Sequence, residues 1–323
     1  MEENAVLFEL FGKPVSPYAA FTAIGALLGF CLFLFLARKQ KKPAVTLAAV
    51  LAVPLGLLGA RAFYVAARWS LFAEIGFHNF FRSAEEDYAY WGSANGAAFW
   101  GAAGGVALAA FCTAKLTRWK TSALLDAFAP GAALALALSR FGESSIGEGI
   151  GPDVSVEGLR FFPIAVVNEW EEWKYAVFLL EGIVALIIFT VLLARGGALK
   201  EGYKARLFLV LYCSSQILLE SLRRDNFLRW LFVRVSQLTA VIVLAFLILF
   251  AILRRAKKPA AERMPMKQVA VCCAVFLLLV GAMIILEFAL DKSENLTVPM
   301  GYLLETLCAV GFGIVSYRLV MKN

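Results

Sequence analysis

The chain of 323 residues contains about nine apolar runs, each close to 20 residues long. A transmembrane helix needs about 20 consecutive apolar residues, whereas the strands of a membrane barrel alternate polar and apolar residues over about 10 positions. The runs do not alternate, so the sequence predicts an all-α, polytopic integral membrane protein. The expected spans are roughly Pro17–Ala37, Val45–Ala67, Gly96–Ala114, Ser122–Phe141, Tyr175–Ala194, Ala205–Leu222, Trp230–Leu253, Val269–Leu290 and Pro299–Val320.

The charged residues between the runs predict how the spans are oriented. Basic residues follow every odd-numbered span, and acidic residues gather in the opposite loops. Because short cytoplasmic loops are enriched in Lys and Arg, we expect the N-terminus outside and the C-terminus in the cytoplasm of a multi-pass protein of the bacterial cytoplasmic (inner) membrane. The basic loops are Arg38–Lys42, Lys115–Lys120, Arg195–Arg206 and Arg254–Lys267, with Arg318 and Lys322 after the last span.

Composition excludes several classes of function. The formal net charge is +7, but the basic residues lie in short loops between spans, so nucleic acid is not an expected partner. None of the six cysteines has metal-site spacing, and the lone histidine, His78, has no evident co-ligands, so neither a metal nor a cofactor is expected. The acidic start, Met1-Glu2-Glu3, indicates no cleavable signal peptide.

Two long outer segments, 68–95 and 161–174, are rich in aromatic residues. Amphipathic rings favour the membrane–water boundary, so these segments are expected to be interfacial anchors, with a binding cleft as the alternative. A domain boundary is expected in the basic, proline-containing loop after the seventh span. The division is a seven-helix domain over residues 1–255 and a two-helix membrane extension over residues 256–323.

The segment from Asp126 to Gly151 combines features that are costly inside a membrane. An apolar helix ends at Arg140, and a glycine-punctuated loop with Glu143 and Glu148 follows. A charge at bilayer depth usually marks a functional site, and glycines allow sharp turns and a close approach of backbone to ligand. We interpret this segment as half of a phospholipid-headgroup site.

The sixth span carries a polar stripe that is expected to form the other half. Its residues Tyr212, Gln216, Glu220 and Arg223 are spaced i, i+4, i+8 and i+11, which places them on one side of a helix. Arginine offers a planar donor fork to phosphate oxygens, and a carboxylate can hold that fork in place. The alternative is a helix-packing network without a ligand.

Other polar groups in the spans have plainer expected roles. Arg61 is either a third cation of the site or a side chain that reaches for the interface. Asp126 is expected to be a helix cap or a first-turn charge, and Glu181 is expected to pair with an arginine. Ser236 and Gln237 are expected to form hydrogen bonds between helices.

These residues resemble the motifs of the bacterial prolipoprotein diacylglyceryl transferases, in order from Tyr18 to Leu253. The signature region of that family is matched by Asp126, Ala129, Pro130, Arg140, Gly142, Gly147, Glu148 and Gly151. Further matches are Tyr18, Gly59-Ala60-Arg61 with Tyr64, Leu180-Glu181-Gly182, Tyr212, Glu220, Arg223 and Ser236-Gln237. The last two spans lie outside the resemblance, because the family usually has seven.

The resemblance implies a membrane transferase that moves a diacylglyceryl group from phosphatidylglycerol to a cysteine thiol of a lipoprotein precursor. Phospholipid and precursor are therefore the implied partners. The implied catalytic residues are Arg140, Glu143, Glu148, Tyr212, Glu220 and Arg223, and the implied substrate-binding residues are Tyr18, Arg61, Gly142, Gly147, Gly151 and Gln216. The two arginines would grip the phosphate, Glu148 and Glu220 would orient them, and Tyr212 would donate to the headgroup.

The chain departs from the family pattern at three places. The region that holds a histidine in the family reads Ala94-Asn95-Gly96-Ala97-Ala98 here, so that histidine is missing. Glu143 stands in place of the asparagine of the signature loop, and Gln216 stands in place of the second arginine. The last two changes remove a positive charge and add a negative one beside the expected phosphate. Glu143 could instead act as a base for the acceptor. The alternatives are a non-catalytic lipid-binding or scaffold protein and, less favoured, a transporter, for which no inverted repeat is evident.

Overall fold

The computed structural model describes residues 6–10, 13–75, 80, 96–168, 170–195, 200–225, 228–230, 233–255, 264–292 and 298–322. The expectations for His78 and for Ala94 and Asn95 fall outside these residues. Within them, nine helices are long and apolar enough to cross a membrane, which confirms the all-α polytopic fold. These are α1 (Pro17–Ala37), α2 (Lys42–Ala67), α4 (Phe99–Thr117), α5 (Thr121–Gly142), α6 (Val177–Ala194), α7 (Tyr203–Leu222), α8 (Val235–Arg255), α9 (Met266–Lys292) and α10 (Val298–Lys322).

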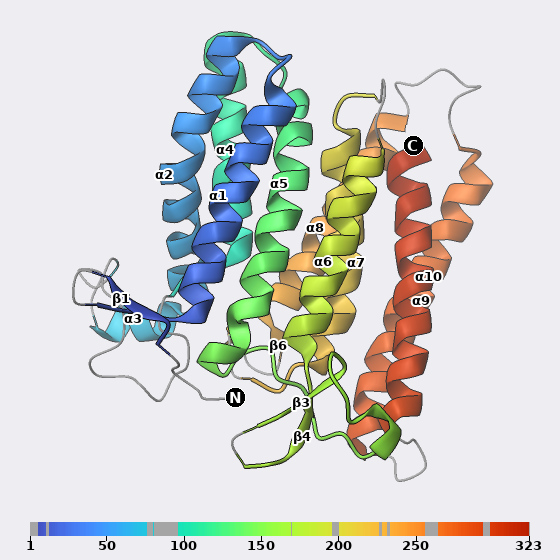
Figure 1. The fold of residues 1–323 in the computed structure, drawn as a ribbon. Coiled ribbons are helices and arrows are strands. Elements are labelled where there is room, and N and C mark those ends of the chain that lie inside the picture. Colours follow the sequence, from blue (N-terminus) through green and yellow to red (C-terminus); the bar gives the residue numbers. More distant parts are fainter. Residues whose placement is uncertain are drawn as a thin grey trace. The chain divides into compact units, whose positions relative to one another are not determined.

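Short elements follow several of the long helices (Figure 1). The helix α3 (Trp69–Ile75) and the 3₁₀ helices η3 (Glu143–Ile146) and η4 (Glu157–Leu159) are among them. Three antiparallel strand pairs are described: β1 (Phe8–Leu10) with β2 (Lys13–Val15), β3 (Ala165–Val167) with β4 (Trp173–Tyr175), and β5 (Arg229–Trp230) with β6 (Val233–Arg234). The apolar spacing did not predict these pairs, because two or three residues are too few to show an alternating pattern.

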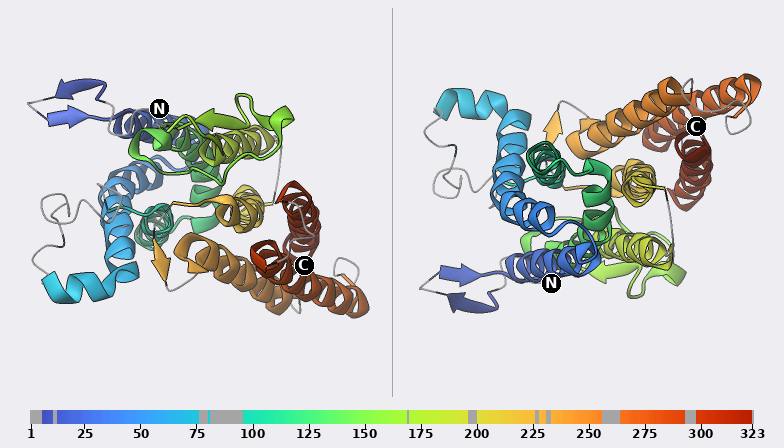
Figure 2. Two further views of the ribbon diagram at one scale, coloured as in Figure 1. Left: turned by 90° about the horizontal axis from the view of Figure 1, so that it is seen from below. Right: turned by 90° about the horizontal axis from the view of Figure 1, so that it is seen from above.

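The chain divides into two compact units, one comprising Met1–Ala205 and Leu222–Ser236, the other Arg206–Ser221 and Gln237–Asn323. In the first unit α1 packs along α5 and α2 along α4, as the view along the helices shows (Figure 2). Glycines allow both pairs to approach closely: a Cβ added to Gly29 would lie 2.5 Å from the Gly131 carbonyl oxygen, and one added to Gly59 would lie 2.3 Å from that of Gly101.

Three of the loops that were expected to be cytoplasmic meet at one end of the first unit. The Gln40 side chain donates to the Ala123 carbonyl and accepts from Trp119 Nε1. Lys120 forms an ion pair with Glu201 at 2.8 Å. The shared end agrees with the alternation of the spans, although which side of a membrane it faces stays a prediction. Beneath these loops lies an apolar cluster made of Phe33, Ala37, Ala48, Ala49, Ala110, Leu124 and Ala127.

The second unit joins most of α7 and α8 to α9 and α10. Its helices α9 and α10 pack together, with the Phe276 and Phe312 rings stacked at 4.5 Å. The α10 side chain Glu305 is 1% exposed and accepts a hydrogen bond from Ser221 of α7 at 3.3 Å. Gln237 of α8 donates to the Ile217 carbonyl of α7, which confirms the hydrogen bond between helices that was expected there. The boundary at residues 255/256 stays a prediction.

Candidate functional site

Arg140 lies in the last turn of α5, where two carboxylates hold its guanidinium. Its Nη1 forms an ion pair with Glu143, three positions further along the chain. Its Nε lies 3.2 Å from Glu181 Oε2 on α6. The Arg140 side chain is 12% exposed, and the two carboxylate side chains are 5% and 1% exposed, so the charges are nearly removed from solvent.

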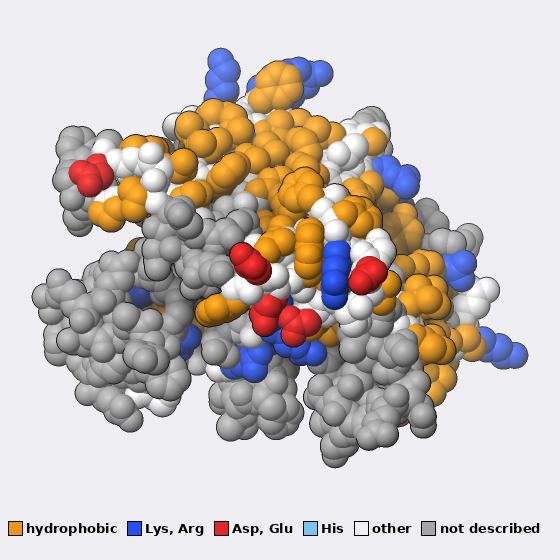
Figure 3. All heavy atoms as spheres, turned by 60° about the horizontal axis from the view of Figure 1, so that its bottom comes forward, with side chains coloured by type: hydrophobic (Ala, Val, Ile, Leu, Met, Phe, Trp, Pro, Cys, Tyr) orange, Lys and Arg blue, Asp and Glu red, His pale blue; other side chains and the backbone are white. Residues whose placement is uncertain are grey.

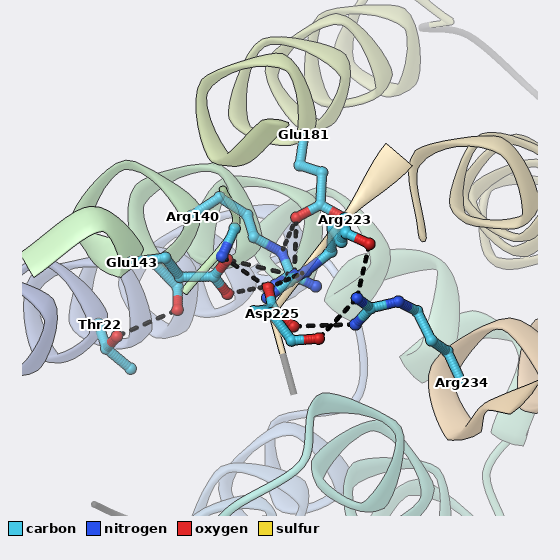
Figure 4. A network of polar contacts seen from close by, with 9 residues as sticks. Thr22, Arg140, Glu143, Glu181, Arg223, Asp225 and Arg234 are labelled. Carbon is cyan, nitrogen blue, oxygen red and sulfur yellow. Dashed lines mark hydrogen bonds and ion pairs between the residues drawn. The ribbon is translucent and has the colours of Figure 1, made fainter. Parts of the chain in front are cut away.

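Arg223 follows the C-terminal end of α7 and points at the same two carboxylates (Figure 4). Its Nη1 lies 3.1 Å from Glu181 Oε2 and 3.3 Å from Glu143 Oε2. The two arginines that the sequence suggested as a pair, 83 positions apart by number, therefore share two acidic partners. The expected pairing of Glu181 with an arginine is confirmed for both of them.

Asp225 and Arg234 extend this cluster. Asp225 accepts hydrogen bonds from Arg223 Nε and Arg234 Nη1, each at 2.8 Å. Arg234 Nη2 also donates to the Arg223 carbonyl at 2.7 Å, which fixes the backbone that presents Arg223. We call Arg140, Glu143, Glu181, Arg223, Asp225 and Arg234 the arginine–carboxylate network.

The network is balanced in charge, with three guanidinium groups and three carboxylates. Charges taken out of water are stable only when partners and hydrogen bonds compensate for the lost hydration. Burial alone raises the pKa of Asp225, but the adjacent Arg223 and Arg234 guanidinium groups outweigh it and hold that pKa well below its usual range. Asp225 is therefore ionised at any physiological pH.

Glu148 lies beside the network and differs from its acidic neighbours. It is 7% exposed, and its Oε1 forms no hydrogen bond within the described part of the chain. Burial, reinforced by the negative charge of Glu143, raises the pKa of Glu148 to about 8. At neutral pH the side chain is mostly protonated, so it adds little negative charge to the network.

The loop after α5 depends on glycines to place these groups. Gly147 and Gly149 have φ values of +69° and +72°, which side chains rarely adopt. The Gly149 N–H donates to Asp225 Oδ2 at 2.8 Å, and Gly151 N–H donates to the Tyr175 carbonyl of β4 at 2.8 Å. The loop is thereby tied both to the network and to the β3–β4 hairpin.

A cavity of about 220 Å³ lies between this loop, the β3–β4 hairpin and the segment after α7. Its polar lining includes Asp225, so the cavity reaches the edge of the network. Acidic and basic side chains gather among apolar ones on this side of the molecule (Figure 3). The lining residues are Ser144, Gly147, Ile150, Gly151, Val166, Val167, Asn168, Trp170, Lys174, Arg224 and Asp225.

Lys174, which lines this cavity, has two acidic partners. The Lys174 ammonium lies 2.9 Å from Glu172 and also forms an ion pair with Asp153. Hydrogen bonds to Asp153 and Glu172 raise the pKa of Lys174 above its usual range. Trp170, which also lines the cavity, is 74% exposed, and Phe162 of the same segment is 71% exposed. The aromatic segment thus offers rings to its surroundings, as an interfacial anchor would.

Among the other residues implicated by sequence, Tyr18 and Gly142 belong to this region. The Tyr18 N–H donates to Ser145 Oγ at 3.1 Å. A Cβ on Gly142 would lie 2.7 Å from the Tyr18 Cα, so only glycine allows α5 and α1 to approach here. Arg61 is placed differently: its guanidinium donates to the carbonyls of Phe80 and Gly96.

Tyr212, Gln216 and Glu220 lie on α7 in the second unit. Each is buried, with 4%, 2% and 3% of its surface exposed. Their part in a site therefore remains a prediction. Asp126 has the capping role that was expected, but for another helix: its carboxylate accepts from the Gly202 and Ala205 N–H groups at 2.6 and 2.9 Å, at the start of α7.

Sequence reasoning missed Asp225 and Arg234. Both stand in a short segment between helices, where apolar periodicity gives no guidance. The sequence signal was Arg223-Arg224-Asp225 directly after an apolar span with a polar stripe, since an acid two positions from a buried arginine can accept its Nε hydrogen bond.

The sequence has relatives among known proteins. The sequence model of the family described as prolipoprotein diacylglyceryl transferase matches residues 5–253. A phosphatidylglycerol–prolipoprotein diacylglyceryl transferase of Streptococcus suis (strain 05ZYH33) is 29% identical over 247 residues, covering 73% of this chain and 88% of the relative. The protein of the same name from Enterococcus faecalis (strain ATCC 700802 / V583) is 27% identical over 266 residues, covering 78% and 91%.

The family match includes the whole network and stops near the end of α8. It leaves α9 and α10 outside, as the sequence resemblance suggested. Because the match covers far more than half of the chain, the protein is a membrane transferase of this kind, and it belongs to the prolipoprotein diacylglyceryl transferase family.

Proposed function

We propose that the protein transfers the diacylglyceryl group of phosphatidylglycerol to the cysteine thiol of a lipoprotein precursor at the outer face of the bacterial cytoplasmic membrane. The names of its relatives support this donor and acceptor. The observation that carries the proposal is the convergence of Arg140 and Arg223, from distant parts of the chain, on Glu143 and Glu181.

The chemistry requires the network to stabilise a leaving phosphate. The thiol sulfur forms a bond to the glyceryl carbon while the bond from that carbon to the phosphate oxygen breaks. Glycerol phosphate leaves with additional negative charge, and a base takes the thiol proton. Guanidinium groups placed in advance beside that charge lower the barrier because they need no reorganisation during the reaction. Arg140 and Arg223 are the groups proposed for this role.

The remaining implicated residues complete the proposal. Glu148 and Glu220 would orient the arginines, Tyr212 would donate to the headgroup, and Tyr18, Arg61 and Gln216 would contact substrate. The loop positions Gly142, Gly147 and Gly151 would let the backbone approach it. Glu143 is the candidate for the base, since its carboxylate lies within the network.

The test uses the full chain reconstituted in vesicles with radiolabelled phosphatidylglycerol and a peptide containing the cysteine of a lipoprotein precursor. Label should move to the peptide, and a peptide with serine in place of the cysteine should remain unlabelled. Arg140→Ala and Arg223→Ala should reduce transfer by at least 100-fold. The absence of labelled peptide with the wild-type chain, correctly inserted, would contradict the proposal.

A second candidate function is lipid binding without catalysis. It is favoured by the charge balance of the network, in which three internal carboxylates already neutralise three guanidinium groups. Complementation of transferase-depleted cells separates the two functions. A chain that inserts normally but does not restore growth would support the non-catalytic candidate.

A further inference from the structure

Glu143 occupies a specific position between the two arginines of the network. One carboxylate oxygen pairs with Arg140 Nη1, and the other lies 3.3 Å from Arg223 Nη1. Only 4% of the residue is exposed. A single negative charge therefore bridges two guanidinium groups in a position almost closed to water.

The carboxylates of the network differ in the hydrogen bonds that they accept. Asp225 accepts hydrogen bonds from two arginines and from the Gly149 N–H. Glu143 Oε2 accepts no hydrogen bond within the described residues, and its contact with Arg223 is an ion pair at 3.3 Å. Glu143 also stands in η3, a short 3₁₀ helix at the end of α5, rather than within a long helix. Its contact with Arg223 is also the longest among the three acids of the network, at 3.3 Å against 3.1 Å for Glu181 and 2.8 Å for Asp225.

A lipid phosphodiester has the same formal charge as this carboxylate and similar acceptor oxygens. Arginine pairs with either group through the same donors. The cavity reaches the neighbours of this position, since its lining includes Ser144, adjacent to Glu143, and Asp225, a partner of Arg223.

We propose that Glu143 is an internal counter-ion that holds the anion position between Arg140 and Arg223, so that a lipid phosphate must displace it to bind. This inference rests on the proposed use of these arginines as the phosphate site. Glu143 thereby sets the affinity for anionic lipid. Without lipid the arginine–carboxylate network stays balanced in charge, and a phosphate that replaces the Glu143 carboxylate leaves the two guanidinium groups with an anionic partner.

The experiment compares the wild-type chain with Glu143→Gln in phosphatidylcholine nanodiscs. Glutamine keeps the shape of the side chain and one acceptor oxygen but removes the competing charge. Binding is measured with fluorescently labelled phosphatidylglycerol and no acceptor peptide. Unlabelled phosphatidylglycerol, phosphatidic acid and inorganic phosphate serve as separate competitors, so that a headgroup-specific site is distinguished from a general phosphate site.

The matched control is Glu201→Gln, which also removes one acid from an ion pair, but at an exposed position next to Lys120. We expect Glu143→Gln to bind labelled phosphatidylglycerol at least tenfold more tightly than the wild type, and Glu201→Gln to bind like the wild type. A second readout is the melting temperature. Added phosphatidylglycerol should raise it more for Glu143→Gln than for the wild type, since at equal concentration a ligand that binds the folded state more tightly stabilises it more.

Equal or weaker lipid binding by a folded Glu143→Gln protein would overturn the inference. The outcome is separable from that of the transfer assay. Tighter binding by the variant together with no transfer by the wild type would support the counter-ion role of Glu143 and contradict the proposed reaction. Transfer by the wild type without tighter binding by the variant would support the reaction and contradict the counter-ion role.

Discussion

Arg223 and Glu181 lie 42 positions apart in the sequence, and their side chains meet at 3.1 Å with 1% of each exposed. The same Glu181 oxygen also lies 3.2 Å from Arg140 Nε. One carboxylate oxygen thus joins the end of α5 to the segment after α7. This relationship makes Glu181 a structural centre of the network, separate from any role in chemistry.

Glu181→Gln should destabilise the protein, because it leaves two buried guanidinium groups with one negative charge too few. Removing one partner of a buried ion pair costs about 3–5 kcal/mol. The measurement is thermal unfolding of the detergent-solubilised full chain. The exposed control Glu201→Gln should change the unfolding free energy by less than about 1 kcal/mol, and equal effects of the two variants would contradict the assignment.

The stability of the wild-type protein should fall as pH rises from about 5 to about 8, because of Glu148. Its folded-state pKa of about 8 lies above the ordinary glutamate pKa of 4.5, so the folded chain binds more protons than the unfolded chain in this window. Because the folded chain holds this extra proton, the free energy of unfolding decreases as pH rises, until the pH passes the folded-state pKa of Glu148. Melting temperatures of the wild type and Glu148→Gln across this window provide the check: the variant should show a shallower decline, and parallel curves would count against it.

Gly149→Ala should destabilise the loop by about 1–3 kcal/mol, since it combines a disfavoured backbone conformation with a steric clash. The residue has a φ of +72°, and an added Cβ would lie 2.5 Å from the Phe178 Cβ and 2.9 Å from Glu143 Oε2. Gly158→Ala is the matched control, because its Cβ would meet nothing within 4 Å. Chemical unfolding should show a lower free energy of unfolding for Gly149→Ala and an unchanged one for Gly158→Ala. An unchanged value for Gly149→Ala would mean that the loop adapts to the added methyl group.

The hydrogen bond from Ser221 to Glu305 should couple α7 to α10 within the second unit. Ser221→Ala and Glu305→Gln, alone and together, form a double-mutant cycle for unfolding. We expect a coupling free energy of about 0.5–1.5 kcal/mol, the usual net contribution of such a bond. Additive single effects would show that the C-terminal helices are held by apolar packing alone.

Much of this fold could be predicted from sequence because a bilayer imposes a length and a composition on each helix. The first span was predicted with the bounds that α1 has, and the fifth with the C-terminal bound of α6. Arg140 and Arg223 could be singled out because a charge within apolar sequence is conspicuous. Asp225 could not be recognised from sequence, because its role depends on hydrogen bonds from Gly149, 76 positions away, and from Arg234. Only folding brings these residues to it.

The close glycine contacts of the first unit also limit the routes by which the proposed lipid donor could reach these arginines. Where α1 meets α5 and α2 meets α4, backbone approaches backbone, and even one added methyl group would overlap a carbonyl. No acyl chain can slide between helices at those two seams. A phospholipid that diffuses within the leaflet would therefore have to enter between other helices, because the α1–α5 and α2–α4 contacts are closed to it.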